Sequence, residues 1–409
     1  MAGVALVAGW LAGAVHAGSA LEELRAWLAQ PPDQRPALTN APWAEAPLTR
    51  EEAAEARRLL WADHVRFIRE TRKAEMQAKV IELDGLRMKF ELLQFLPPSG
   101  GAPTNGWSLF FSLHGGGGAP KRVNDSQWRN QIRLARAYRP REGFYLAPRA
   151  PTDTWNLWHQ AHIDRFFDRL IENLIVLAGV NPNRVYVFGY SAGGDGVYQL
   201  APRMADRWAA AAMMAGHPND ASPLGLRNVP FALQVGADDA AYHRNEVAAE
   251  WGRRLDELQR ADPEGYRHLV KLHEGKGHWM DLEDRQAIPW MEQFTRNPIP
   301  DRVVWHQDDV THTRFYWLEV PPEEAKPGRE LIAERHGQEI TLTTDDYPVV
   351  TVLLDDRMMD LDRPVTIRAG DRRLFKGKPP RTIRNLADTL AGRGDPELMF
   401  SAAVTVRLD

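Results

Sequence analysis

Residues 184–194 read RVYVFGYSAGG, and this stretch decides how the middle of the chain folds. The aromatic and β-branched run that ends at Tyr190 predicts a buried strand. The glycines on both sides of Ser191 predict a tight turn, because residues without a Cβ atom tolerate a crowded backbone. A helical pattern over 193–204 follows the turn. The sequence therefore predicts a strand, a sharp turn and a helix, with the Ser191 hydroxyl lifted above the end of a sheet.

Other short apolar runs surround this stretch and alternate with helical patterns. Such alternation is typical of a mostly parallel sheet with helices on both faces, which is an α/β architecture. A hairpin over 79–95, turning at Asp84 and Gly85, is expected at the edge of that sheet. The remaining strands are expected at 107–114, 143–148, 208–216, 229–236 and 267–275, and the remaining helices at 162–178, 244–260 and 282–295.

Two further parts are expected on either side of this α/β domain, which we place at 79–297. Residues 21–78 predict an N-terminal helical arm that packs on the α/β domain, because Thr49 and Glu52 form a capping box before an apolar helix stripe. Residues 298–409 predict a C-terminal β-rich, sandwich-like domain. Its strands are expected at 314–320, 338–344, 349–355, 364–370, 372–377 and 402–409, with one helix near 382–392.

The composition excludes several functional classes. The 409 residues contain no cysteine, which removes disulfides, thiolate nucleophiles and cysteine-ligated metals. The 51 Lys and Arg residues do not exceed the 55 Asp and Glu residues, so the chain lacks the basic excess of a nucleic-acid-binding protein.

The first twenty residues are apolar and end near a small-residue cleavage pattern, Val15-His16-Ala17. Residues 1–20 therefore predict a signal peptide and a periplasmic or secreted protein. The run is too short for a transmembrane span. No Lys or Arg precedes Arg25, so a cytoplasmic location remains the alternative.

A run of four glycines, Gly115 to Gly118, follows His114 at the end of the strand over 107–114. Backbone N–H groups without neighbouring side chains suit the stabilisation of an oxyanion. The amides of Gly115 or Gly116, together with that of Ala192, are the candidate donors. A phosphate-binding loop is the alternative, but the G-K-S/T pattern that it needs is missing near Lys121.

A serine hydroxyl needs a general base, and the base needs an orienting carboxylate. Asp238 and Asp239 follow the strand over 229–236, and His278 follows the strand over 267–275. Because the carboxyl ends of parallel strands meet at one edge of a sheet, these side chains are expected to converge on Ser191. The residues alone leave the choice between the two aspartates open.

These motifs, HGGGG, GYSAGG, GADD and GKGH, together resemble an α/β-hydrolase, and in particular the polyhydroxybutyrate-depolymerase and feruloyl-esterase-like group of serine esterases. The resemblance covers about residues 80–297. It implies Ser191 as nucleophile and His278 as base, and it favours Asp239 over Asp238, because the acid in that group commonly follows a glycine by three positions. The missing cysteines depart from many secreted members and leave the substrate open.

Aromatic side chains close to these motifs are candidates for substrate binding, namely Trp155, Trp158, Tyr190 and Trp279, with burial in the core as the alternative. His159, His162 and Asp164 lack a recognised ligand spacing, so no metal and no cofactor is expected.

The sequence thus predicts a serine hydrolase that cleaves carboxylic esters of small or polymeric substrates through an acyl-enzyme. A serine peptidase of the same fold, or a non-catalytic binding protein on a hydrolase scaffold, are the alternatives. The C-terminal domain is expected to contact a polymer or a protein partner.

Overall fold

The computed structural model describes residues 19–409. Residues 1–18 of the predicted signal peptide lie outside the described residues. Within the described part, no helix is both long and apolar enough to cross a membrane. Ser19, at the start of the described chain, caps the first helix, α1 (Ala20–Ala29).

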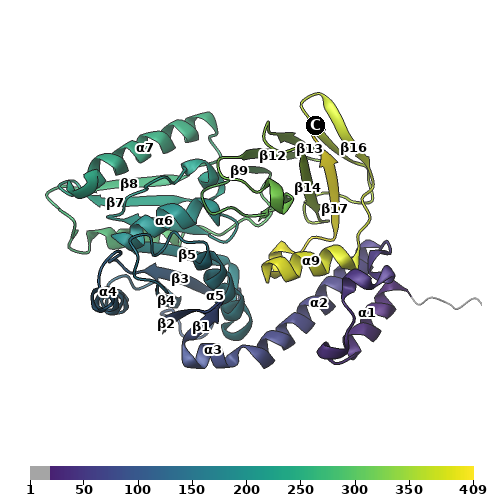
Figure 1. Cartoon of the computed structure of the whole chain (residues 1–409), viewed down its shortest axis with the longest axis horizontal. Helices are drawn as coiled ribbons and strands as arrows, with labels where there is room; N and C mark the ends of the chain where they lie inside the picture. The colour runs from purple at the N-terminus through teal and green to yellow at the C-terminus, as the bar shows by residue number, and fades with distance from the viewer. Residues whose placement is uncertain (1–18) are drawn as a thin grey trace, which may run out of the picture.

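An eight-stranded sheet forms the centre of the molecule (Figure 1). Its strand order is β1-β2-β4-β3-β5-β6-β7-β8. The β1–β2 and β2–β4 pairs are antiparallel, and all pairs from β4 to β8 in this order are parallel. This is the strand order of the α/β-hydrolase fold, as predicted. The strands are β1 (Val80–Leu83), β2 (Leu86–Phe95), β3 (Trp107–Leu113), β4 (Gly143–Arg149), β5 (Val180–Tyr190), β6 (Ala210–Met214), β7 (Phe231–Gly236) and β8 (His268–His273).

Helices cover both faces of this sheet, because each face presents a separate apolar cluster. One face packs against α5 (His162–Ala178), α6 (Ala192–Arg203) and α7 (Arg244–Ala261), and the other packs against α4 (Lys121–Leu134) and α8 (Ala287–Met291). Helix α4 was not expected from the sequence. The single helix expected over 282–295 is wrong: a 3-10 turn (Glu283–Gln286) precedes α8, and the chain then leaves the helix so that the Arg296 amide donates to the Asn183 carbonyl.

The C-terminal part contains two β-sheets and one helix, α9 (Ile383–Arg393). One sheet has the order β10-β11-β14-β17 and the other β16-β15-β13-β12-β9. The single strand expected over 314–320 is wrong: the left-handed backbone of Tyr316 (φ 53°) turns it into a tight hairpin. The strands are β9 (Arg302–His306), β10 (Arg314–Phe315), β11 (Leu318–Glu319), β12 (Glu330–His336), β13 (Glu339–Thr343), β14 (Val349–Leu354), β15 (Val365–Ala369), β16 (Arg372–Gly377) and β17 (Ala402–Arg407).

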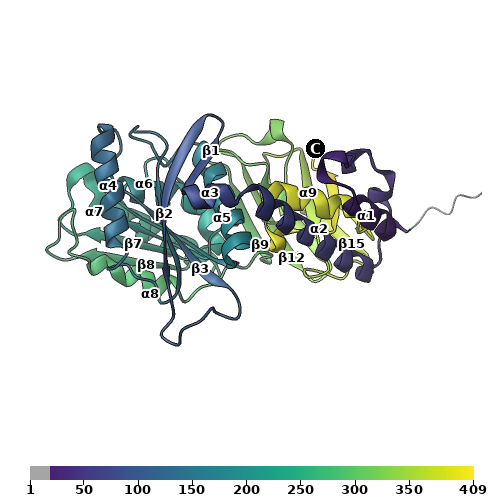
Figure 2. The ribbon, with the colours of Figure 1, turned by 90° about the horizontal axis from the view of Figure 1, so that it is seen from below.

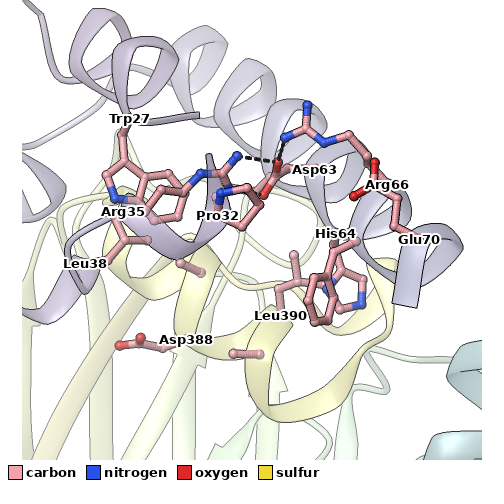
Figure 3. A pocket seen from close by; sticks show the side chains of 14 residues that line it. Trp27, Pro32, Arg35, Leu38, Asp63, His64, Arg66, Glu70, Asp388 and Leu390 are labelled. Carbon is pink, nitrogen blue, oxygen red and sulfur yellow. Dashed lines mark hydrogen bonds and ion pairs between the residues drawn. The ribbon is translucent and has the colours of Figure 1, made fainter. Parts of the chain in front are cut away.

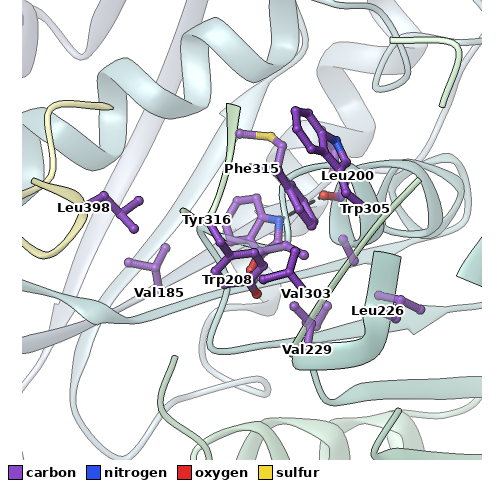
Figure 4. Close-up of a cluster of buried hydrophobic side chains, with 14 of the residues drawn as sticks. Val185, Leu200, Trp208, Leu226, Val229, Val303, Trp305, Phe315, Tyr316 and Leu398 are labelled. Carbon is purple, nitrogen blue, oxygen red and sulfur yellow. Dashed lines mark hydrogen bonds between the residues drawn. The ribbon is translucent and has the colours of Figure 1, made fainter. Parts of the chain in front are cut away.

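The two parts share one continuous hydrophobic core (Figure 4). Trp208 and Val229 of the α/β part contribute to the same cluster as Val303, Trp305 and Phe315 of the β-rich part. Because these side chains are buried against one another, removing the β-rich part would expose a large apolar surface. Whether this part also contacts a polymer or a protein partner stays a prediction.

The N-terminal arm consists of α1, α2 (Arg50–Thr71) and α3 (Lys73–Ala78). Figures 1 and 2 show α2 running beside α9 towards α5. The apolar side of the arm packs mainly on Leu386 and Leu390 of α9. The arm therefore lies chiefly on the C-terminal part and not, as expected, mainly on the α/β part, which it meets where α3 lies beside β1 and where Arg72 pairs with Glu172.

A cavity of about 330 Å³ remains between the arm and α9 (Figure 3). Trp27, Arg35 and His64 line it, and an ion pair of Arg35 with Asp63 spans 2.6 Å at its rim. None of the predicted site residues lines this cavity.

Candidate active site

Ser191 lies on the turn between β5 and α6 and has a strained backbone (φ 57°, ψ −123°). The two glycines of the motif make this turn possible. A Cβ atom on Gly189 would lie 2.3 Å from the Gly193 carbonyl oxygen, and one on Gly193 would lie 2.2 Å from the Leu113 carbonyl oxygen. The predicted sharp turn is therefore present, and its glycines are required for steric reasons.

His278 and Asp239 both reach this turn from separate loops. The Nε2 atom of His278 lies 3.0 Å from the Ser191 Oγ, and its Nδ1 atom lies 2.8 Å from Asp239 Oδ2. A carboxylate only accepts hydrogen bonds, so Nδ1 carries the proton, and Nε2 is free to accept from the serine hydroxyl. Asp238 is exposed, and its backbone amide donates to the Lys276 carbonyl. The structure thus brings Asp239, and not Asp238, to His278.

The loops that carry Asp239 and His278 fit together through Gly236. A Cβ atom at this position would lie 2.1 Å from the Gly277 carbonyl oxygen. Tyr190 fixes the His278 loop from below, because its hydroxyl donates to the His278 carbonyl and accepts from the Met280 amide at 3.3 Å. Tyr190 is nearly buried and still lines one cavity beside Ser191, so it contributes to both the loop and the cavity wall.

The glycine loop runs past Ser191, with positive φ at Gly116 (116°) and Gly117 (108°). Asn124 of α4 holds the loop: its Oδ1 accepts from the Gly117 amide at 3.1 Å, and its Nδ2 donates to the Gly117 carbonyl at 2.9 Å. The Gly117 amide is therefore engaged. Among residues 19–409, no protein acceptor is found for the amides of Gly115, Gly116 and Ala192, so the choice between Gly115 and Gly116 as the partner of Ala192 stays a prediction.

His114 locks the base of the same loop. Its Nε2 accepts from the Ala150 amide at 3.2 Å, and its Nδ1 lies 2.6 Å from the Gly115 carbonyl, to which it donates. Burial lowers the pKa of His114 to about 4, so the ring is neutral at pH 7. The sequence alone predicts no role for His114 or Asn124, although His114 begins the glycine motif.

Two cavities meet at Ser191, one on each side. The first, of about 400 Å³, is lined by Gly117, Trp155, Ala192, Asp195, His217, Tyr242 and Arg244. The second, of about 600 Å³, is lined by Gly115, Gln127, Asn130, Arg133, Tyr190, His278 and Trp279. Trp155 (64% exposed) lines the first cavity and Trp279 (46% exposed) lines the second, and their role in substrate binding stays a prediction.

Trp158 is the exception among the predicted aromatic residues. It is fully buried, its Nε1 donates to the His114 carbonyl at 2.9 Å, and its ring packs against Phe167. A Cβ atom on Gly196 would lie 2.4 Å from the Trp158 Cβ, so the indole is fitted tightly against α6. Trp158 supports the active-site loops and does not face a substrate.

Asp195, on the first turn of α6, lines the first cavity. Burial raises its pKa to about 6, although the His217 amide, which donates to Oδ1 at 2.6 Å, opposes the shift.

Asp164 lies in a buried ion-pair network. Its carboxylate accepts from Arg203 at 2.5 and 3.0 Å, and from His312 at 2.9 Å. Asp164 thus ties α5 to α6 and to the C-terminal part.

Comparisons with known proteins give matches only among solved structures. No protein-family model matches the chain, and a search of curated proteins finds no match. A thermostable esterase is 20% identical over 53% of this chain and 62% of its own, with a TM-score of 0.40, so the chain spans about three fifths of that protein. A ferulic acid esterase is 14% identical over 52% of this chain and 96% of its own (TM-score 0.35).

The poly(3-hydroxybutyrate) depolymerase LpqC from Bordetella parapertussis is 16% identical over 52% of this chain and 87% of its own, with a TM-score of 0.39. The assignment of the fold depends on the strand order of the central sheet rather than on these similarities. The chain has the α/β-hydrolase fold, and Ser191, Asp239 and His278 lie where that fold brings the loops after β5, β7 and β8 together.

Proposed function

We propose that this protein is a serine hydrolase that cleaves carboxylic esters. The observation that carries the proposal is the unbroken line of contacts from Ser191 Oγ through the His278 imidazole to the Asp239 carboxylate, at 3.0 and 2.8 Å. Both distances are within hydrogen-bonding range for a nucleophile, a base and an orienting acid.

In the first half of the reaction, the Ser191 Oγ attacks the ester carbonyl carbon and its proton passes to His278 Nε2. Asp239 stabilises the resulting imidazolium through the Nδ1 hydrogen bond. The carbonyl oxygen becomes an oxyanion and accepts from the amide of Gly115 or Gly116 and from that of Ala192. The C–O bond then breaks, and the alkoxide leaves with the proton from Nε2.

In the second half, water attacks the acyl group on Ser191 and gives a proton to Nε2 of His278. The second tetrahedral intermediate collapses, the proton returns to the Ser191 Oγ, and the carboxylic acid leaves. The reaction needs no group beyond the side chains and amides named here and a water molecule.

The Ser191→Ala variant tests the proposal. We expect turnover of short 4-nitrophenyl esters to fall by about 10⁴-fold or more, since the nucleophile is removed, while the thermal unfolding midpoint stays close to that of the wild type. Labelling by a fluorophosphonate probe should disappear in parallel. Wild-type protein that is folded but neither turns over the esters nor takes the label would instead favour a binding protein.

A comparison of esters with anilides of the same acyl group separates an esterase from a peptidase. An esterase releases 4-nitrophenol from the ester and leaves the matched 4-nitroanilide nearly intact. Efficient cleavage of the anilide would identify a peptidase, because the same nucleophile and base also act on amides.

A further inference from the structure

The two cavities at Ser191 receive different halves of an ester, and this assignment follows from the path of the proton. In the proposed reaction the leaving alkoxide takes its proton from His278 Nε2, so the alcohol half must lie on the His278 side. Only the second cavity is lined by His278 and Trp279. The acyl half therefore extends into the first cavity, towards Asp195 and Arg244.

Arg244 contributes to this acyl cavity a guanidinium whose hydrogen-bond donors are only partly paired. The residue is 9% exposed, and its Nε is buried without an acceptor among residues 19–409. Its Nη1 has only long contacts, 3.3 Å to the Ala241 carbonyl and 3.7 Å to Asp239 Oδ1, and in the described part of the chain no acceptor is found for Nη2. A buried guanidinium normally satisfies its donors. Nε is enclosed by the protein, whereas Nη2 is not among the enclosed atoms, so Nη2 is the donor that an anionic acceptor in the cavity can reach.

The loop before α7 has an unusual backbone and places Tyr242 beside this guanidinium. Tyr242 (φ 56°) and His243 (φ 55°) both have left-handed backbones, which are costly for residues with side chains. This backbone leaves Tyr242 76% exposed at the cavity, with the Arg244 guanidinium 4.8 Å from its ring centroid. Trp155 lines the same cavity. The cation thus lies in a cavity with aromatic walls, where a carboxylate would be partly shielded from water.

The carboxylate of Asp195 does not take the place of a ligand. Its Oδ1 accepts from the His217 amide at 2.6 Å, and no hydrogen bond joins it to Arg244 among the described residues. Asp239 is directed to His278 at 2.8 Å and meets Arg244 only at 3.7 Å. Both neighbouring carboxylates therefore have better partners than the guanidinium.

We propose that Arg244 binds a carboxylate at the far end of the acyl group, so that the preferred substrates are half-esters of dicarboxylic acids. This inference rests on the proposed ester hydrolysis and names the substrate class of that site. Arg244 acts on specificity here, since it contacts the acyl chain away from the reacting carbonyl.

The test compares anionic and neutral acyl groups with one leaving group. Rates are measured for the 4-nitrophenyl half-esters of adipic and suberic acid, and for 4-nitrophenyl hexanoate and octanoate. We expect the ratio of kcat/KM for the anionic to the neutral ester to fall about tenfold or more in Arg244→Gln, because a charge-assisted pair is lost. Arg244→Lys should keep most of the ratio, since it keeps the charge.

Arg253→Gln is the matched control. Arg253 lies on the same helix, is exposed and, among residues 19–409, pairs only with Glu250, so its loss should leave the ratio unchanged. An equal fall of both rates in Arg244→Gln would overturn the proposal, since Arg244 would then act only through Asp239. A wild-type protein without activity on any of the esters would count against the hydrolase function itself.

Should Arg244→Gln fail to fold, inhibition of the wild type decides the matter. Adipic acid monoamide and neutral adipamide are compared as inhibitors of 4-nitrophenyl hexanoate hydrolysis. Stronger inhibition by the anionic monoamide supports the proposal, and equal inhibition by the two compounds overturns it.

Discussion

The pKa values of two buried aspartates shift in opposite directions: Asp164 lies at the junction with the C-terminal part, and Asp195 lies at the candidate active site. Burial alone would raise the pKa of Asp164, but Arg203 and His312 outweigh it, and the pKa is lowered. At the active site burial prevails, and the pKa of Asp195 rises to about 6. An aspartate side chain, buried in the same fold, therefore favours its charged form at the junction and its neutral form in the cavity beside Ser191.

The difference shows that buried ion pairs stabilise this fold at the junction between the α/β part and the C-terminal part. At the junction, cationic side chains pair with Asp164 and Asp206: Asp206 likewise has a lowered pKa, because Arg393 and Arg207 outweigh its burial. Breaking such a pair leaves an uncompensated charge in the interior. At the candidate active site, the His217 amide and Arg244 only partly offset the burial of Asp195, so its charged form reduces stability at neutral pH.

The largest effect is expected from Asp164→Asn. The substitution keeps the size of the side chain and removes the partner of Arg203, whose side chain is only 1% exposed. We expect the free energy of unfolding at pH 7.5 to fall by about 3–5 kcal/mol, measured by urea denaturation. Asp84→Asn is the control, since Asp84 pairs with Arg165 in solvent and should change stability by less than about 1 kcal/mol. Equal losses in the two variants would remove the contrast between buried and exposed pairs.

A smaller, pH-dependent effect is expected from His114. Its pKa is about 4 in the folded protein against 6.5 as the ordinary value, because burial disfavours the charged ring. The contribution to stability is therefore complete above pH 6.5 and is lost as the pH falls towards 4, by at most about 3 kcal/mol. His159, whose pKa is also lowered to about 4 by burial, adds to the same slope.

The measurement is urea denaturation of the wild type and of His114→Gln at several pH values between 7.5 and 4.5. The variant should show a shallower loss of stability, by about 1.4 kcal/mol per pH unit. Parallel curves for the two proteins would mean that His114 does not stay neutral in the folded state.

The smallest effect is expected from Asp195→Asn, and it has the opposite sign. The pKa of Asp195 in the folded protein is about 6, above the ordinary value of 3.8. The free energy of unfolding therefore decreases as the pH rises from 3.8 through 6, because the unfolded chain releases this proton more readily. An asparagine can still accept from the His217 amide without a charge. We expect a gain of about 1–3 kcal/mol at pH 7.5 that vanishes near pH 4, measured by thermal and urea unfolding. A loss of stability at pH 7.5 would show that the charged form is compensated after all.

Much of the α/β part could be predicted because local pattern and tertiary environment agree there. The β1–β2 hairpin turns at Asp84 and Gly85 as expected, and α5 has the predicted bounds, 162–178. The parallel strands are apolar on both faces, so short apolar runs in the sequence were sufficient to find them. Prediction was weaker where a strand is only two residues long, as in the hairpin around Tyr316.

The aromatic residues show the limit of prediction from residue type. Trp155 and Trp158 lie three residues apart on one loop, yet one is 64% exposed at a cavity and the other is fully buried. Hydrophobicity is the same for both, so only the direction of each side chain and the space beside Gly196 decide the difference. The packing of the arm on α9 could not be predicted for a similar reason. An apolar stripe on a helix indicates that the stripe is buried, but it does not indicate which element covers it.

The sequence by itself determined the strand-turn-helix at Ser191, the glycine loop and the order of Ser191, Asp239 and His278, because backbone sterics and hydrophobic period act over a few neighbouring residues. Only the tertiary structure decided which loop residues meet: it directed Asp239 rather than Asp238 to His278, and brought Arg244 into the cavity that Gly117 and Trp155 line beside Ser191. Distances between segments far apart in the chain depend on how whole elements pack, and no local pattern encodes them.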